Sequence, residues 1–137
     1  MPYAAQPLAA IVDDDLDCAR TLAQMLEDLG WASEVYASAA SLMQAGQPAA
    51  YRAIFLDLSM PEMDGIELIW RFSAMDVHVP LVLVSGHSQS VLAAAQTIAL
   101  QSGTPTVETL AKPVRARDIA HIVQDIFDAP RHAKDSA

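Results

Sequence analysis

Short apolar runs alternate along the chain with longer amphipathic stretches. Apolar runs bounded by polar or turn-forming residues are typical of buried strands. In the longer stretches, apolar residues recur three and four positions apart, which is typical of helices packed on a core. The predicted strands cover residues 8–12, 31–36, 53–56, 80–84 and 106–111. The predicted helices cover residues 16–29, 38–45, 66–73, 88–102 and 114–127. This alternation predicts an α/β fold, a doubly wound parallel sheet with right-handed crossovers and helices on both faces.

Single residues mark several of the helix ends. Gly30 and Gly103 stand where a C-terminal cap is expected, and Ser38 stands where a capping serine opens a short helix. The first, third and fourth strands are almost wholly apolar, so we expect them at the centre of the sheet. The helix over 66–73 is expected to carry three apolar residues on one side. These are Ile66, Ile69 and Trp70.

The composition fits one compact globular domain. The chain has 137 residues, of which 53% are hydrophobic and 18% charged, so it is too apolar to be disordered. Seventeen acidic side chains against eight basic ones give a net charge of −9, which argues against nucleic acid as a direct ligand. We expect one domain over residues 7–129, an N-terminal extension over 1–6 and a flexible tail over 130–137.

Two further features concern the cellular compartment. Cys18 is the only cysteine, which excludes an internal disulfide and suits a reducing compartment. No apolar stretch approaches the roughly 20 residues that span a bilayer, and residues 1–10 lack the pattern of a signal peptide. These features predict a cytoplasmic domain that does not bind the membrane.

Polar residues follow four of the predicted strands. Asp13 and Asp14 come after the first strand, Asp57 after the third, Ser85 ends the run of the fourth and Lys112 follows the fifth. Because ligands of such sheets bind at the carboxyl ends of the strands, we expect these side chains to converge on one site.

The residue types at this edge indicate phosphoryl transfer. Gathered carboxylates repel one another unless a cation offsets them, and Mg²⁺ favours carboxylate oxygens together with a phosphate. Lys112 suits a carboxylate or a phosphoryl oxygen, Ser85 offers a rotatable hydroxyl, and Gly86 leaves the approach open. A carboxylate nucleophile with neutralising groups around it is the equipment for accepting a phosphoryl group.

Four segments carry a resemblance to the receiver domain of bacterial two-component response regulators. They are the Ile-Val-Asp-Asp-Asp run at 11–15, the segment from Phe55 to Gly65 with its D-x-x-M-P-x-M-D-G pattern, Val-Ser-Gly at 84–86 and Ala-Lys-Pro-Val at 111–114. The resemblance spans roughly residues 7–128. It implies a flavodoxin-like sheet with strand order 2-1-3-4-5.

The resemblance also implies a role for the acidic residues. Asp57 would be the phospho-acceptor, attacking a phosphohistidine or a small acyl phosphate. Asp13 and Asp14 would hold Mg²⁺ together with Asp57 and the backbone carbonyl of Ser59. Asp15 lies one residue beyond the acidic pair of the family, and we interpret it as a helix-start carboxylate.

Other residues would carry the switch. Lys112 would pair with the acceptor at rest and with the phosphoryl group afterwards, and Ser85 would move to bind a phosphoryl oxygen. The peptide bond before Pro113 is typically cis in the family. His87, two residues beyond the serine, is a candidate modulator of dephosphorylation. Thr109 stands where many receivers carry an aromatic residue that rotates on activation, so the relay of the signal must differ here.

The resemblance implies protein partners. A sensor histidine kinase or a histidine phosphotransfer protein would supply the phosphoryl group, and a downstream protein or regulator would read the switch. Residues 86–107 contain no Asp, Glu, Lys or Arg. A helix without charges here is either partly buried by an unusual loop or forms an apolar docking surface. We favour a docking surface on the face of the fourth helix and fifth strand, which would also serve a homodimer that includes the last helix.

Two other functions fit part of the pattern. A hydrolase of the haloacid dehalogenase type also uses a strand-end aspartate and Mg²⁺, but it needs an acid two residues later, where this chain has Ser59. A receiver-like adaptor that does not depend on phosphate is the second alternative, and the substitution at Thr109 is the feature that supports it.

Overall fold

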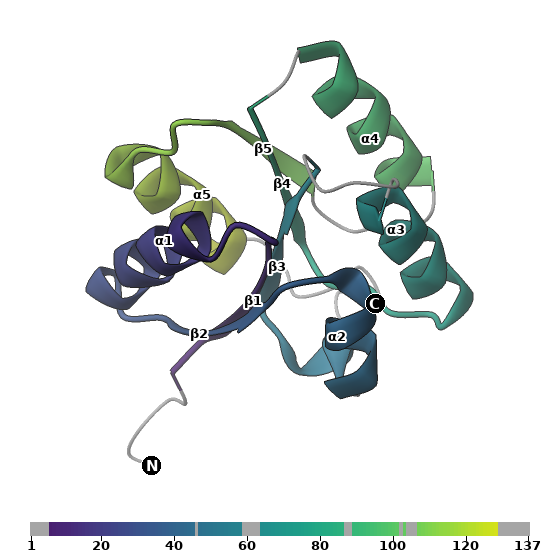
Figure 1. Cartoon of the computed structure of the whole chain (residues 1–137), viewed down its shortest axis with the longest axis horizontal. Coiled ribbons are helices and arrows are strands. Elements are labelled where there is room, and N and C mark those ends of the chain that lie inside the picture. Colours follow the sequence, from purple (N-terminus) through teal and green to yellow (C-terminus); the bar gives the residue numbers. More distant parts are fainter. Residues whose placement is uncertain are drawn as a thin grey trace.

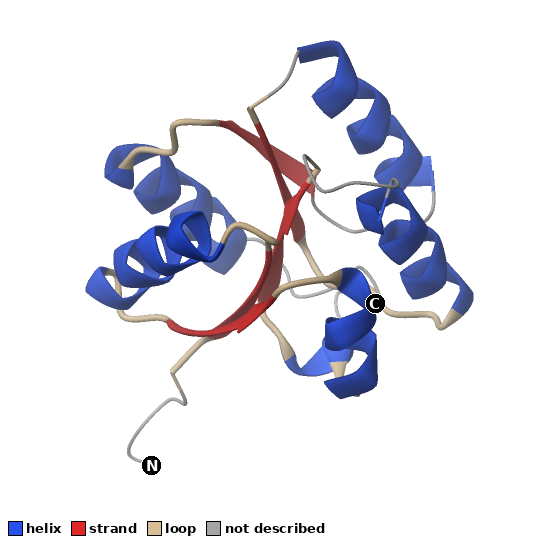
Figure 2. Cartoon of the chain, viewed as in Figure 1, coloured by secondary structure: helices blue, strands red, loops and turns tan. Residues whose placement is uncertain are grey.

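The computed structural model describes residues 6–45, 47–58, 64–86, 89–101, 103 and 107–128. A parallel five-stranded sheet lies between two layers of helices (Figure 1), and all its neighbouring strands run in the same direction. The strand order is β2-β1-β3-β4-β5, which confirms the predicted doubly wound topology. Figure 2 shows the strands of the sheet in red, with helices in blue on both of its sides.

Every predicted strand and helix is present in the described residues, with ends that differ by at most two positions. The strands are β1 (Leu8–Val12), β2 (Ala32–Tyr36), β3 (Ala53–Asp57), β4 (Leu81–Ser85) and β5 (Val107–Ala111). The helices are α1 (Leu16–Asp28), α2 (Ala39–Ala45), α3 (Asp64–Ala74), α4 (Gln89–Gln101) and α5 (Ala116–Asp128). A short 3₁₀ helix, η1 (Pro48–Ala50), was not predicted, and α3 begins at Asp64, two residues before its predicted start.

The sheet divides the core into two halves. One half lies under α2, α3 and α4, and the other lies under α1 and α5, on the opposite face of the sheet (Figure 1). Successive residues of each strand point to opposite faces, so Ile54 and Leu56 enter the first half and Phe55 enters the second. All five residues of β3 and of β4 are buried, as expected for central strands.

Local capping explains where the first helices begin and end. Asp15 caps α1 because its carboxylate accepts hydrogen bonds from the backbone N–H groups of Asp17 and Cys18. Gly30 ends α1 with φ +88°, a conformation that favours glycine, and its N–H donates to Glu27. The hydroxyl of Ser38 accepts the N–H of Ser41 at the start of α2, as predicted.

The expected orientation of Trp70 is wrong. Ile69 is buried, whereas Trp70 is 57% exposed on the outer side of α3. Successive helical residues lie about 100° apart, and Leu68, Ile69 and Phe72 already fill the core-facing stripe of this helix. The side chain of Ile66 lies outside the described residues, as does the predicted tail over 130–137.

None of the helices in the described ranges is long and apolar enough to cross a lipid bilayer.

A pair of leucines tests the assignment of the core. Leu26 on α1 has no exposed surface, whereas Leu100 on α4 is 53% exposed. We expect Leu26→Ala to lower the free energy of unfolding by about 2–5 kcal/mol, because it leaves a cavity. Leu100→Ala should change it by no more than about 0.5 kcal/mol. Urea unfolding followed by circular dichroism measures both, and equal losses would contradict this assignment.

Candidate functional site

The polar residues predicted to converge do meet at the carboxyl edge of the sheet. Asp13 and Asp14 follow β1, Asp57 is the last residue of β3, Ser85 is the last residue of β4, and Lys112 follows β5. β1, β3, β4 and β5 lie side by side in that order, so parallel pairing brings their carboxyl ends together. Strand register therefore builds this site from residues far apart in the sequence.

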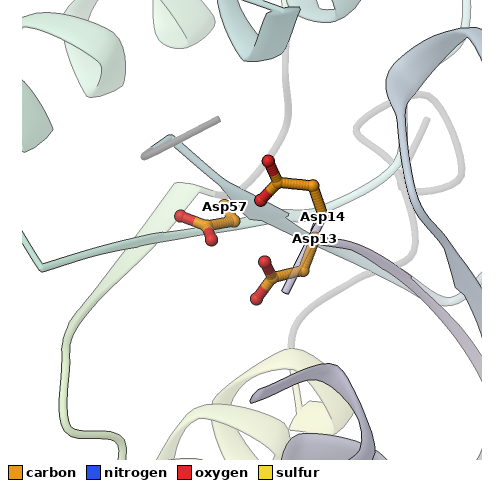
Figure 3. Close-up of side chains that lie close together, drawn as sticks. All are labelled: Asp13, Asp14 and Asp57. Atoms are coloured by element: carbon orange, nitrogen blue, oxygen red, sulfur yellow. The ribbon is translucent and has the colours of Figure 1, made fainter. Parts of the chain in front are cut away.

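Three carboxylates form the acidic part of the site. One oxygen from each of Asp13, Asp14 and Asp57 lies within 4.8 Å of the others, and Figure 3 shows the three side chains grouped at the strand ends. Asp13 and Asp57 are buried, while Asp14 is exposed. Closely spaced oxygen ligands, one of them open to solvent, fit a hard divalent cation that keeps some of its water.

The acidic group is electrostatically unfavourable by itself. Burial raises the pKa of Asp13 to about 6, and a hydrogen bond with Asp57 and the charge of Asp57 act in the same direction. The backbone N–H of Asp15 donates to Asp13 Oδ1 at 2.9 Å and partly offsets this effect. Two buried carboxylates in contact therefore need a positive charge nearby.

Lys112 supplies that charge. Its Nζ lies 2.9 Å from Asp57 Oδ2 and 3.7 Å from Asp13 Oδ2. Burial alone would lower the pKa of Lys112, but the hydrogen bond and charge of Asp57, with the charge of Asp13, outweigh it and raise the pKa above its usual value. The ammonium group is thus held in its charged form between the two buried carboxylates.

The backbone fixes the position of this lysine. Its N–H donates to the carbonyl of Ser85 at 3.0 Å, which extends the pairing of β4 with β5 by one bond. The Lys112–Pro113 peptide bond is cis, as the resemblance implied.

Ser85 and Gly86 form the wall of the site at the end of β4. Ser85 is completely buried. A Cβ added at Gly86 would lie 3.8 Å from Cβ and Cδ of Lys112, which is ordinary van der Waals contact. Among the described residues, the packing around Gly86 therefore has room for a Cβ.

Asp15 has the predicted helix-start role and a connection to the site that the sequence did not reveal. Hydrogen bonds from the backbone and thiol of Cys18 lower the pKa of Asp15, whose own N–H binds Asp13. The cap of α1 and the acidic group are therefore joined directly. Cys18 is half-buried, and its hydrogen bond to Asp15 raises the pKa of the thiol, which makes it a structural rather than a reactive cysteine.

The remaining predicted site residues have different positions. Thr109 lies on β5, opposite Leu83 on β4, and is half-buried. Its small side chain stands two residues before the end of the strand. Ser59 and His87 lie outside the described residues, so their predicted roles stay predictions.

Residues 9–124 match the sequence family described as "Response regulator receiver domain". The chain belongs to this family. Phosphorylation of an aspartate is the general function of receiver domains, which are the switching modules of two-component signalling systems.

Individual relatives agree with this assignment. The chain is 34% identical over 113 residues to the C4-dicarboxylate transport transcriptional regulatory protein DctD of Rhizobium meliloti (strain 1021), which covers 82% of this receiver and 23% of that protein. It is 28% identical over 120 residues to the response regulator receiver protein CpdR of Brucella abortus (strain 2308), covering 87% of this chain and 95% of that one. The crystal structure of a response regulator from Colwellia psychrerythraea superposes with a TM-score of 0.78 at 28% identity, covering 89% and 97% of the two chains.

The relatives differ in length. The chain spans 23 to 56% of the length of several curated relatives, among them the transcriptional regulatory protein FixJ of Azorhizobium caulinodans, but nearly all of CpdR. What is shared is the receiver itself. The activities and partners of the longer relatives are not carried over with it.

The burial of Asp13 leads to a prediction about stability and pH. Because the pKa of Asp13 is raised in the folded protein, the folded state holds this proton more tightly than the unfolded state does. Ionisation of Asp13 therefore destabilises the fold as the pH rises through about 6. In EDTA, we expect Asp13→Asn to be more stable than the wild type at pH 7.5, with a difference that shrinks toward pH 4.5.

Urea unfolding at a series of pH values measures this difference. Asp28→Asn, at the exposed end of α1, is the matched control and should follow the wild type at every pH. A stability difference for Asp13→Asn that did not change with pH would contradict the electrostatic explanation.

Proposed function

We propose that Asp57 is the phospho-acceptor of this receiver and that the domain works as a phosphorylation-controlled switch in signalling rather than as a metabolic enzyme. The observation that carries the proposal is a buried carboxylate, Asp57, with the ammonium group of Lys112 at 2.9 Å and two more carboxylates beside it. A structural carboxylate needs one partner. A phospho-acceptor also needs a cation site next to it. Asp57 has Lys112 as its ion-pair partner, and Asp13 and Asp14 beside it would form the cation site.

The transfer itself needs little from the protein beyond position and charge. An oxygen of Asp57 attacks the phosphorus of a phosphohistidine, or of an acyl phosphate. A new P–O bond forms to Asp57. With phosphohistidine the P–N bond of the donor breaks and its electron pair returns to the imidazole nitrogen; with an acyl phosphate the P–O bond of the donor breaks and its electron pair stays on the departing carboxylate. Lys112 stays within reach of the oxygens that then carry the charge.

Asp13, Asp14 and Asp57 would hold the Mg²⁺, with the carbonyl of Ser59 as a further predicted ligand. The metal would supply positive charge to a site whose acceptor changes from a carboxylate with one negative charge to an acyl phosphate with about −1.5 to −2. The exposed Asp14 leaves one side of the cluster open to the donor. In this proposal Asp13 is both a metal ligand and the counter-charge of Lys112.

Ser85 would connect the site to the rest of the fold. It ends β4, its carbonyl accepts the N–H of Lys112, and the segment that follows leads into α4. Movement of its hydroxyl toward a phosphoryl oxygen would displace the beginning of α4. Because Thr109 replaces the usual aromatic residue, α4 itself would carry the signal, and His87 would influence the lifetime of the phosphoryl group.

The donor would be a sensor histidine kinase or a histidine phosphotransfer protein. The output would be a protein contact on the face of α4, β5 and α5, where a second copy of the chain would bind. The described residues of α4 that are exposed are all uncharged, namely Ala93, Ala94, Thr97, Leu100 and Gln101. On a protein of net charge −9, an uncharged helix face lets two copies approach with little repulsion.

Phosphorylation is tested by incubation with acetyl phosphate and Mg²⁺, followed by intact-mass measurement. We expect one phosphoryl adduct on the wild type, none on Asp57→Asn, and none when EDTA removes the metal. Asp28→Asn, far from the site, should be modified like the wild type. An adduct that persists in Asp57→Asn would show that the acceptor is another residue. No adduct with any donor would favour the phosphate-independent adaptor.

The proposed output face is tested by adding a charge to it. We expect Ala94→Glu to weaken the self-association of the phosphorylated protein in sedimentation velocity, while adduct formation stays unchanged. Ala74→Glu, at the exposed end of α3, is the matched control and should associate like the wild type. Loss of association in both variants, or in neither, would contradict this placement of the interface.

A further inference from the structure

The side chain of His78 joins two loops at the amino edge of the sheet, opposite the edge that carries Asp57. It lies between α3 and β4, and its Nε2 is 2.6 Å from Oδ1 of Asp76. Its Nδ1 is 3.0 Å from the backbone carbonyl oxygen of Gly103, which follows α4. The ring therefore connects the α3–β4 loop to the carboxyl end of α4.

Both partners of the ring accept hydrogen bonds. The carbonyl of Gly103 has no proton to give, and neither does the ionised carboxylate of Asp76. A neutral imidazole carries one N–H and can satisfy only one of these two acceptors. An imidazolium carries two N–H groups and satisfies both. Only the protonated ring of His78 can therefore make both hydrogen bonds of this contact.

Both residues that His78 contacts, Asp76 and Gly103, have a positive backbone φ angle. Asp76 has φ +58°, which is uncommon for a residue other than glycine, and this conformation places its carboxylate beside His78. Gly103 has φ +94°, and a Cβ there would lie 3.4 Å from Cε1 of His78. The close approach of the ring to this turn therefore favours glycine.

Few other charges act on this ring. Arg71, in the last turn of α3, pairs with a glutamate of its own helix at 2.7 Å. The last turn of α4 is uncharged, and residues 86–107 contain no acidic or basic side chain apart from a histidine at the opposite end. Glu108 on β5 faces α5. Asp76 is therefore the charged group that faces His78 among the described elements around it.

We propose that His78 is a proton-operated clamp that fastens the carboxyl end of α4 to the α3–β4 loop. When the ring is protonated, both hydrogen bonds form and the end of the helix is held. When the ring is neutral, it can donate only one of the two hydrogen bonds, and the end of α4 is released. The stabilisation that the clamp gives is present at low pH and disappears as the pH rises.

The clamp acts on the helix that the proposed switch would move. α4 has 13 residues and is about 20 Å long, so its two ends lie at opposite edges of the sheet. One end follows Ser85 and the other is tied to His78. A closed clamp would oppose displacement of α4 during the switch. This consequence rests on the proposed function, but the two hydrogen bonds of His78 are independent of it.

Hydrogen exchange of the unphosphorylated protein tests the clamp directly. In the wild type we expect the protection of the last-turn amides of α4 and of the Gly103 N–H, corrected for intrinsic exchange, to be severalfold higher at pH 5.5 than at pH 8. The ring ¹⁵N shifts of His78 should show both nitrogens protonated when the protection is high. The exposed His121 on α5 serves as the internal comparison.

Two variants separate the clamp from a general effect of pH. His78→Gln cannot change its charge, and Asp76→Gly removes one acceptor while keeping a residue that tolerates the backbone conformation. Both should lose the pH dependence of protection at the end of α4. An unchanged pH dependence in both variants, or a single neutral tautomer of His78 whenever protection is high, would overturn the proposal.

The same variants keep this result distinct from the proposed function. His78→Gln should still form the Asp57 adduct with acetyl phosphate, because it lies at the other edge of the sheet. A normal adduct with pH-independent exchange in the wild type would refute the clamp and leave the acceptor in place. pH-dependent exchange at the end of α4 without any phosphoryl adduct would support the clamp and refute Asp57 as the acceptor.

Discussion

The ion pair between Lys112 and Asp57 is the interaction on which the rest of the site depends. Two buried carboxylates in contact would each resist ionisation, and the ammonium group 2.9 Å from one and 3.7 Å from the other holds them in place. The pair joins residues 55 positions apart in the chain. The register of β3, β4 and β5 brings its two residues together, so the geometry of the site depends on the pairing of the sheet.

Much of the fold could be predicted from the sequence because burial in a parallel sheet leaves a simple pattern. β1, β3 and β4 are covered on both faces, and their continuous apolar runs were therefore unambiguous. The site could be predicted for a related reason. Asp13 and Asp57 each follow an apolar run directly, Lys112 follows the fifth predicted strand, and strand ends in such a sheet share one edge. The family resemblance then supplied the roles that spacing alone could not.

The features that escaped prediction depend on side-chain direction rather than on pattern. Ile69 and Trp70 are adjacent apolar residues on one helix, and only the packing of Leu68 and Phe72 decides which of them is buried. The contacts of His78 depend on left-handed backbone at Asp76 and on a glycine 25 residues away. The link from the cap of α1 to Asp13 runs through a backbone N–H, which carries no residue-specific signal.

The composition of α4 has a mechanical consequence. Among its described side chains, only Ala95 and Ala99 are fully enclosed, whereas α5 anchors itself with Ile119, Ile122, Val123 and Ile126. Alanine side chains form only shallow ridges that pack weakly into the grooves of a neighbouring element, and each makes few dispersion contacts. The described part of α4 therefore buries less side-chain volume against the sheet than α5 does, and shifting it would sacrifice less packing energy.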